Sequence, residues 1–285
     1  MTKPTRVRLT RKIWLGIGAA TLIGSAGTLP AQAQHAGHGK QQDAKTPQSG
    51  QPAAPAAAAT PAEGGESYLT DGGPKDTRIR FYRDVELVRG HLVVGQELIK
   101  LGQWDEALPH FLHPTEELYD GLEKYIKGHN LQPFKRELLA LAKAVKTKKE
   151  GAVQQAQKVL DPKLDAAVAA VRKFMAPPEG YAMKTAAELL KVAQSEYASA
   201  IENGRFVKPV EYQDGRGFML RAEKMIAEAA TVLAAKDAQA VARVQKQFEV
   251  LKAAWPAAVP PETPAIEPGK LSALVSDIEL HVSRF

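Results

Sequence analysis

Histidine side chains are concentrated in one short stretch of the chain. Four of the seven histidines lie within 39 residues, at His91, His110, His113 and His129, and acidic residues accompany them. Imidazole nitrogens combined with carboxylate oxygens suit cations of borderline hardness, such as iron, zinc and copper. This stretch is therefore the first candidate for a metal site.

Two antiparallel helices are needed to bring these residues together. Apolar residues recur at intervals of three and four between residues 79 and 101, which predicts an amphipathic helix ending at Gly102. A second helix is expected from Gln103. His91 lies eleven residues before Gly102 and His113 eleven residues after it, so the two imidazoles are predicted to lie at similar heights in the hairpin.

The second helix of this hairpin carries further candidate ligands. His110 precedes His113 by three residues. Glu116 and Glu117 follow His113 by three and four residues, a spacing that places side chains on one helical face. The expected metal ligands are His91, His113, Glu116 and Glu117, joined by His110. The alternative, a set of histidines hydrogen-bonded within an apolar core, stays open.

The same hairpin resembles one tetratricopeptide repeat. The small residues Gly95 and Ala107 allow two helices to approach, and Phe111 fills the space between them. This resemblance implies a helical scaffold that binds a protein partner. Successive copies at a fixed period, which a solenoid of such repeats needs, are not found in the sequence.

A second group of carboxylates lies near the middle of the C-terminal half. Glu196 is expected on a helix over residues 185–203, with Gly204 as its left-handed cap. Glu211 and Asp214 follow at the start of the next helix, where acidic residues complement the helix dipole. A structural role explains these acids, and Glu196, Glu211 and Asp214 also form a second candidate for metal binding.

This second group lies within a recognisable pattern of Glu-Tyr, Asn-Gly and Glu-Tyr-x-Asp between Ser195 and Glu223. It resembles the helical extracytoplasmic domain attached to bacterial members of the high-affinity iron permease family. The resemblance implies a role in iron uptake and an inner-membrane metal permease, or another periplasmic protein, as partner. The membrane-spanning permease part of that family, with its acidic iron motifs, has no counterpart in this sequence.

A weaker resemblance concerns four residues of the first hairpin. His113-Pro114-Thr115-Glu116 is similar to the H-x-x-E motif of imelysin-like periplasmic iron-uptake proteins, which are also helical bundles. If the likeness holds, His113 and Glu116 are the positions that carry over. Leu112 departs from the motif, where a small residue is usual before the histidine.

The rest of the chain also predicts helices. Pro109 and Pro114 predict a kink or a restart in the second helix. No alternating apolar pattern indicates a strand, so the fold class is all-α, an antiparallel helical bundle. Two similar Lys-rich turns leave open a duplication into stacked subdomains, divided near residues 176–182. The further expected helices cover residues 133–146, 152–174, 210–234, 238–255 and 270–285.

The N-terminal segment predicts export. Residues 1–33 contain five cations without an acid, an apolar run from Ile13 to Ile23, and a small-residue ending at Ala33, which is typical of a signal peptide. We expect cleavage after Ala33 and a soluble periplasmic protein. Residues 34–75 are rich in Ala, Pro and Gln and predict a disordered linker before a helical domain over residues 76–285. An ordinary polar tail is the favoured explanation of His35 and His38, and a loose metal site beside the new N-terminus is the alternative.

Composition excludes several functions. Without the five cations of the signal peptide, 33 basic residues balance 32 acidic ones, so the basic surface that nucleic-acid binding requires is lacking. The absence of cysteine excludes disulfides, thiol catalysis and covalent haem attachment. No catalytic signature is found, and an enzyme is not expected. The sequence therefore predicts an exported metal-binding protein, accessory to iron or copper uptake or handling, with an extracytoplasmic scaffold as the alternative.

Overall fold

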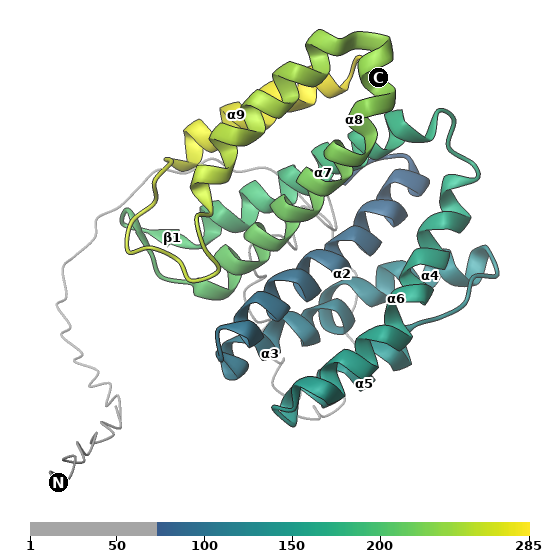
Figure 1. Ribbon diagram of the computed structural model, residues 1–285, viewed down its shortest axis with the longest axis vertical. Coiled ribbons are helices and arrows are strands. Elements are labelled where there is room, and N and C mark those ends of the chain that lie inside the picture. Colours follow the sequence, from purple (N-terminus) through teal and green to yellow (C-terminus); the bar gives the residue numbers. More distant parts are fainter. Residues whose placement is uncertain (1–72) are drawn as a thin grey trace, which may run out of the picture. The chain divides into compact units, whose positions relative to one another are not determined.

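The computed structural model describes residues 73–285, and they are predominantly helical. This confirms the all-α fold class. The signal peptide predicted over residues 1–33, almost all of the linker predicted over residues 34–75, and the loose site at His35 and His38 lie outside the described residues. Figure 1 shows how the helices are arranged.

The first hairpin consists of α2 (Thr77–Lys100) and α3 (Trp104–His113). Helix α2 begins after Asp76, whose side chain accepts a hydrogen bond from the backbone N–H of Arg78 at 2.9 Å. The turn passes through Gly102, whose φ of 76° is unfavourable for other residues. A Cβ atom at Gly95 would lie 2.6 Å from the Phe111 ring, so the predicted packing of an aromatic ring against a small residue is confirmed.

The helix type changes directly after α3, at the proline that the sequence singles out. Pro114 has no N–H to donate, and the chain widens there into a short π-helix (Pro114–Leu118). Pro114 is at the first position of this π-helix, as predicted, but the chain stays helical through it and no break separates the two segments. Helix α4 (Tyr119–Gly128) continues from the π-helix.

The remaining helices agree with the expected ranges to within a few residues, except at the start of α7. That helix begins at Pro178, seven residues before the expected start, because a proline at the first helical position already has the φ that a helix needs. The helices are α5 (Lys135–Lys146), α6 (Glu150–Arg172), α7 (Pro178–Ser199), α8 (Pro209–Leu251), a 3₁₀-helix (Lys252–Ala254) and α9 (Pro268–Val282).

A miniature β-hairpin separates α7 from α8, and here two expectations are wrong. The helix expected to reach residue 203 ends at Ser199, and β1 (Ile201–Glu202) pairs antiparallel with β2 (Arg205–Phe206). Asn203 and Gly204 have φ values of 52° and 75°. Two successive left-handed residues make the tight turn of a hairpin, so Gly204 is a hairpin residue rather than a helix cap.

Helix α8 is interrupted at Asp237, whose φ and ψ of −152° and 87° are not helical. The Asp237 side chain accepts a hydrogen bond from the backbone N–H of Ala240 at 2.9 Å, as an N-capping residue does. The two helices predicted over residues 210–234 and 238–255 therefore correspond to the two halves of α8.

Helix α8 packs against both α2 and α7, and α9 packs against α7 and α8. The backbones of α2 and α8 are in close contact, because a Cβ atom at Gly217 would lie 2.2 Å from the carbonyl oxygen of Gly90. Ion pairs between Arg216 and Glu97 and between Arg221 and Glu86 join the same two helices. This approach places the start of α8 against the middle of α2.

Helix α5 packs against α3 and α6, and buried apolar side chains of all these helices contribute to the core. The duplication and the division near residues 176–182 stay predictions. Among residues 73–285, no helix combines the length and the apolar character needed to cross a bilayer.

Candidate metal centre

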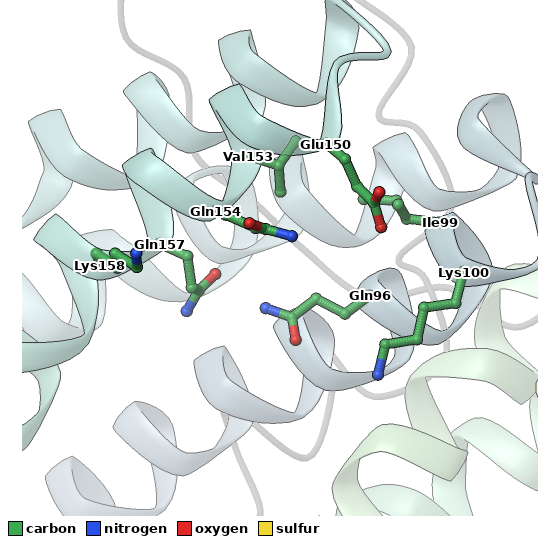
Figure 2. A pocket seen from close by; sticks show the side chains of 8 residues that line it. All are labelled: Gln96, Ile99, Lys100, Glu150, Val153, Gln154, Gln157 and Lys158. Atoms are coloured by element: carbon green, nitrogen blue, oxygen red, sulfur yellow. The ribbon is translucent and has the colours of Figure 1, made fainter.

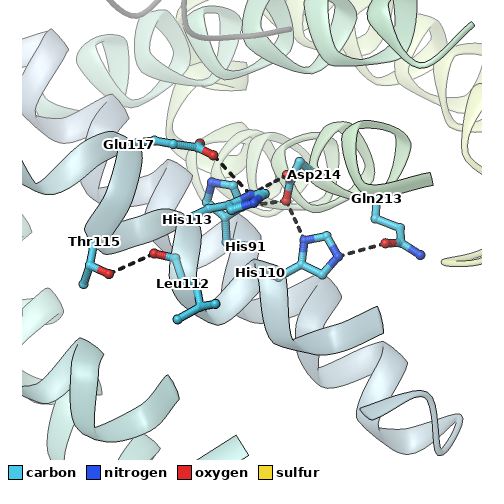
Figure 3. Close-up of polar contacts among 8 residues, drawn as sticks. All are labelled: His91, His110, Leu112, His113, Thr115, Glu117, Gln213 and Asp214. Carbon is cyan, nitrogen blue, oxygen red and sulfur yellow. Dashed lines mark hydrogen bonds and ion pairs between the residues drawn. The ribbon is translucent and has the colours of Figure 1, made fainter. Parts of the chain in front are cut away.

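Three helices bring four potential ligands together. His91 comes from α2, His110 and His113 from α3, and Asp214 from the second turn of α8. Each of the four offers one ligand atom, and these atoms all lie within 4.8 Å of one another. Figure 3 shows the imidazoles of His110 and His113 directed toward the Asp214 carboxylate.

The three imidazoles approach Asp214 through the same ring nitrogen. The Nδ1 atoms of His91 and His110 lie 2.6 Å and 2.7 Å from Oδ1, and Nδ1 of His113 lies 3.1 Å from Oδ2. Because a carboxylate only accepts hydrogen bonds, each Nδ1 must carry a proton to donate to it. Oδ1 therefore accepts from two donors and Oδ2 from one, within the four lone pairs that a carboxylate offers.

Gln213, beside Asp214, contacts the other nitrogen of His110. Its Oε1 atom lies 2.9 Å from Nε2 of His110 and accepts a hydrogen bond when that nitrogen is protonated. With Nε2 protonated, Nδ1 is the nitrogen that can lose its proton and bind a cation. Such outer hydrogen bonds orient a ligating histidine and select its tautomer.

The centre is almost completely removed from solvent. His91, His110 and Asp214 are 1%, 0% and 5% exposed. Burial lowers the pKa of His91 below its ordinary value of 6.5, although the charge of Asp214 opposes this shift. Burial alone would raise the pKa of Asp214, but the neighbouring histidines outweigh it and hold that pKa well below 3.8. A buried, ionised carboxylate needs a positive partner nearby.

The donor set suits a transition metal. Three imidazole nitrogens and one carboxylate oxygen are the ligand types of zinc, iron and copper sites, and four ligands satisfy a tetrahedral ion or leave positions open on a larger one. A cation bound among them would replace the protons that the three Nδ1 atoms now donate. The chemistry available to the cluster is therefore reversible exchange of protons for a metal ion.

Glu117 lies beside this cluster. Its Oε1 atom is 3.3 Å from Nδ1 of His113, and Figure 3 shows its carboxylate turned toward that ring. Its side chain is 17% exposed, so Glu117 is the more accessible partner of His113. It can complete the coordination of a cation or assist its arrival.

The second candidate group, Glu196, Glu211 and Asp214, does not stay together in the structure. Of the second group, Asp214 joins the histidines of the first. Glu196 is buried near the end of α7, and Glu211 is paired with Lys208 at 3.8 Å; neither belongs to the four-residue cluster. Glu116 is exposed on the π-helix and also lies outside the cluster.

Sequence reasoning missed Gln213 and the role of Asp214 as the acceptor for all three histidines. Both depend on the register between α8 and the first hairpin, more than 100 residues apart in the chain. The glycines at residues 90 and 217 are a partial signal, because paired glycines permit helices to approach closely.

The described residues also enclose cavities away from the cluster. One of about 320 Å³ lies between α2 and α6, and Figure 2 shows Gln96 and Gln157 turned toward each other across it. Its charged residues come from both helices and are two cations, Lys100 and Lys158, and one anion, Glu150. None of the four cluster residues lines this cavity.

Comparison with known families concerns the C-terminal part of the chain. The family model that describes the iron permease-associated 4-helix bundle domain matches residues 179–285. Searches of curated proteins and of solved structures gave no match. The matched part includes α7, the two halves of α8, and α9, which are four helical segments, and it contains Gln213 and Asp214. Over residues 179–285 the chain thus matches the iron permease-associated 4-helix bundle domain, which confirms the relation to iron permeases indicated by the Glu-Tyr and Asn-Gly pattern.

Proposed function

We propose that this protein binds a divalent transition-metal ion at His91, His110, His113 and Asp214 and acts as an exported accessory to iron uptake. One observation carries the proposal: four ligand atoms from three helices lie within 4.8 Å of one another around a buried carboxylate. A metal ion supplies the positive charge that this carboxylate needs.

Iron is favoured by the family match, and copper by ligand chemistry. The matched domain is described by its association with iron permeases. Nitrogen-rich sites bind copper more tightly than ferrous iron, so affinity measured with purified ions does not identify the metal bound in the cell. We therefore propose iron from the family relation and take copper as the alternative.

The proposal is for binding and delivery, not for catalysis. Ligands that are 9% exposed or less leave little room for a substrate beside the ion. Export to the periplasm rests on the predicted signal peptide, and an inner-membrane iron permease is the partner that the family match favours.

Elemental analysis and calorimetric titration test the proposal directly. Untagged protein starting at residue 34 is titrated with Fe(II), Cu(II) and Zn(II), the iron titration being anaerobic. We expect one ion per chain and, for His113→Ala, an affinity lower by at least about tenfold, or 1.4 kcal/mol. His281→Ala is the matched control, because His281 is also 9% exposed and bonded to its own helix but lies outside the cluster.

Two results contradict the proposal. One is the absence of binding at micromolar metal by a protein that is folded. The other is an equal effect of the His113 and His281 substitutions. Either result leaves the histidines as hydrogen-bonded core residues and favours the scaffold in which the first hairpin binds a protein partner.

A further inference from the structure

A buried metal centre needs a path from solvent, and one cavity is lined by Glu117, which contacts the centre. This cavity, of about 670 Å³, lies between the first half of α2 and the segment formed by the π-helix and α4. Its wall includes Phe81 and Asp84 on one side and Glu117, Gly121 and Lys124 on the other. We name it the α2–α4 cavity.

Glu117 connects the α2–α4 cavity to the centre. Its side chain lines the cavity and its carboxylate also lies 3.3 Å from Nδ1 of His113. His113 in turn lies 3.1 Å from Asp214. A continuous series of polar contacts therefore runs from the cavity to the buried carboxylate.

The side of the cavity formed by α2 also relates it to the centre. Asp84 lies seven residues before His91, which is two helical turns along the same face of α2. Its carboxylate is 2.8 Å from the buried guanidinium of Arg83, so this wall is fixed. The cavity wall at Asp84 and the cluster residue His91 thus lie on one face of α2.

The charges of the cavity are mixed. Three carboxylates line it, Asp84, Glu117 and Asp120, together with the cations Arg80 and Lys124 and the imidazole of His129. Arg80 donates a hydrogen bond to the carbonyl oxygen of Pro74 at 2.8 Å, and Asp84 forms an ion pair with Arg83. Of the carboxylates, Glu117 is the one in contact with the centre.

The geometry points to the α2–α4 cavity as the access route for the metal ion, with Glu117 as its first ligand from the protein. This inference rests on the proposed metal-binding function. A hydrated divalent ion binds the Glu117 carboxylate, exchanges its water for the imidazole of His113, and passes to the centre. The protons displaced from Nδ1 atoms leave to water through the same cavity.

Gly121 offers a way to block this route without touching a ligand. It is exposed on α4, and a Cβ atom there meets nothing within 4 Å. Side chains of a helix lean toward its N-terminus, so a leucine at residue 121 covers Glu117, four residues earlier. The substitution also favours the helix, because glycine is the poorer helix former. Gly121→Leu is therefore expected to fold and to cover Glu117 where that residue lines the cavity.

Gly128→Leu is the matched control. Gly128 ends the same helix, is exposed, and likewise has open space for a Cβ atom, but it does not line the α2–α4 cavity. Thermal unfolding of both variants checks that each is folded.

Co²⁺ serves as the probe, because its visible absorption reports binding in stopped-flow experiments. Association is followed after mixing with Co²⁺, and release after mixing the loaded protein with excess EDTA. A blocked route slows both directions equally. For Gly121→Leu we expect both rate constants to fall by about tenfold or more, with an unchanged dissociation constant, and Gly128→Leu to behave as the unsubstituted protein.

Glu117→Gln gives a second test, since it keeps the length of the side chain and removes its charge. We expect slower Co²⁺ association, and less slowing by added salt than in the unsubstituted protein, because an exposed charge that attracts the ion is screened by salt.

The outcomes distinguish failure of the access route from failure of the metal site. Unchanged rates for Gly121→Leu, or a change in the dissociation constant caused by faster release alone, overturn the route while the metal site stands. Failure of the unsubstituted, folded protein to bind Co²⁺ overturns the metal site, and the route with it.

Discussion

At the scale of single residues, His91 makes the stability of the metal-free protein depend on pH. Burial lowers the pKa of His91, so the unfolded chain takes up its proton more readily than the folded protein does. The free energy of unfolding therefore has its full value above the ordinary pKa of 6.5, where His91 is neutral in both states. It decreases as the pH falls from there through the lowered pKa of the folded protein. Asp214, whose folded pKa is also lowered, adds a second loss below 3.8.

We therefore expect the free energy of unfolding in urea to decrease as the pH is lowered from about 7.5 to about 5. In His91→Gln, which removes the titrating ring, this decrease should be smaller. The measurement is a series of urea titrations of metal-free protein at each pH. An identical pH dependence in the two proteins would show that His91 does not carry the effect.

At the scale of helices, the contact between Gly90 and Gly217 holds the centre together. A Cβ atom at residue 217 would lie 2.2 Å from the Gly90 carbonyl oxygen, a backbone atom that cannot rotate away. Gly217→Ala must therefore separate α2 from α8, which carry His91 and Asp214. We expect a loss of stability of about 1–3 kcal/mol and a weaker affinity for Co²⁺.

Gly269→Ala is the control for this prediction, because Gly269 is exposed at the start of α9 with open space for a Cβ atom. Urea unfolding and Co²⁺ titration of both variants provide the measurements. Stability and affinity that remain unchanged in Gly217→Ala would contradict the role assigned to the helix contact.

Most helices and the geometry of the first hairpin could be predicted from the sequence, because these features are local. The intervals between apolar residues and the equal spacing about Gly102 are enough to place His91 near His113, whose ring centroids are 5.4 Å apart. The dipeptide Asn203-Gly204 is a strong hairpin signal, so this turn could also be predicted from the sequence. The interpretation of Gly204 as a helix cap overlooks that signal. Asp214 is expected from the sequence beside Glu196 and Glu211 but lies among the histidines, because its neighbours are set by packing between distant helices.

At the scale of the whole molecule, the centre joins two parts of the chain that differ in their relation to known families. The three histidines precede residue 179, and Asp214 lies within the matched domain. A metal ion bound by α2, α3 and α8 stabilises the folded state of all three helices together. At a Co²⁺ concentration of about 100 times the dissociation constant we expect a gain of about 2.7 kcal/mol in the free energy of unfolding.

Thermal unfolding with and without Co²⁺ measures this gain, and hydrogen exchange locates it. Protection should increase in α2 and α3 as well as in α8. Asp214→Asn should lose most of the gain. Protection confined to the matched domain, residues 179–285, would place the ion elsewhere.

The direct contact between the backbones at Gly90 and Gly217 has a consequence for the entry of an ion into the site. Two helices that already touch can move apart, but they cannot move closer. The ligand atoms of His91 and Asp214 already lie 2.6 Å apart, which is closer than two atoms that each stand about 2.1 Å from one tetrahedral ion. The site must therefore open slightly for any ion, and this movement can come only from separation of the two helices or from rotation of the side chains.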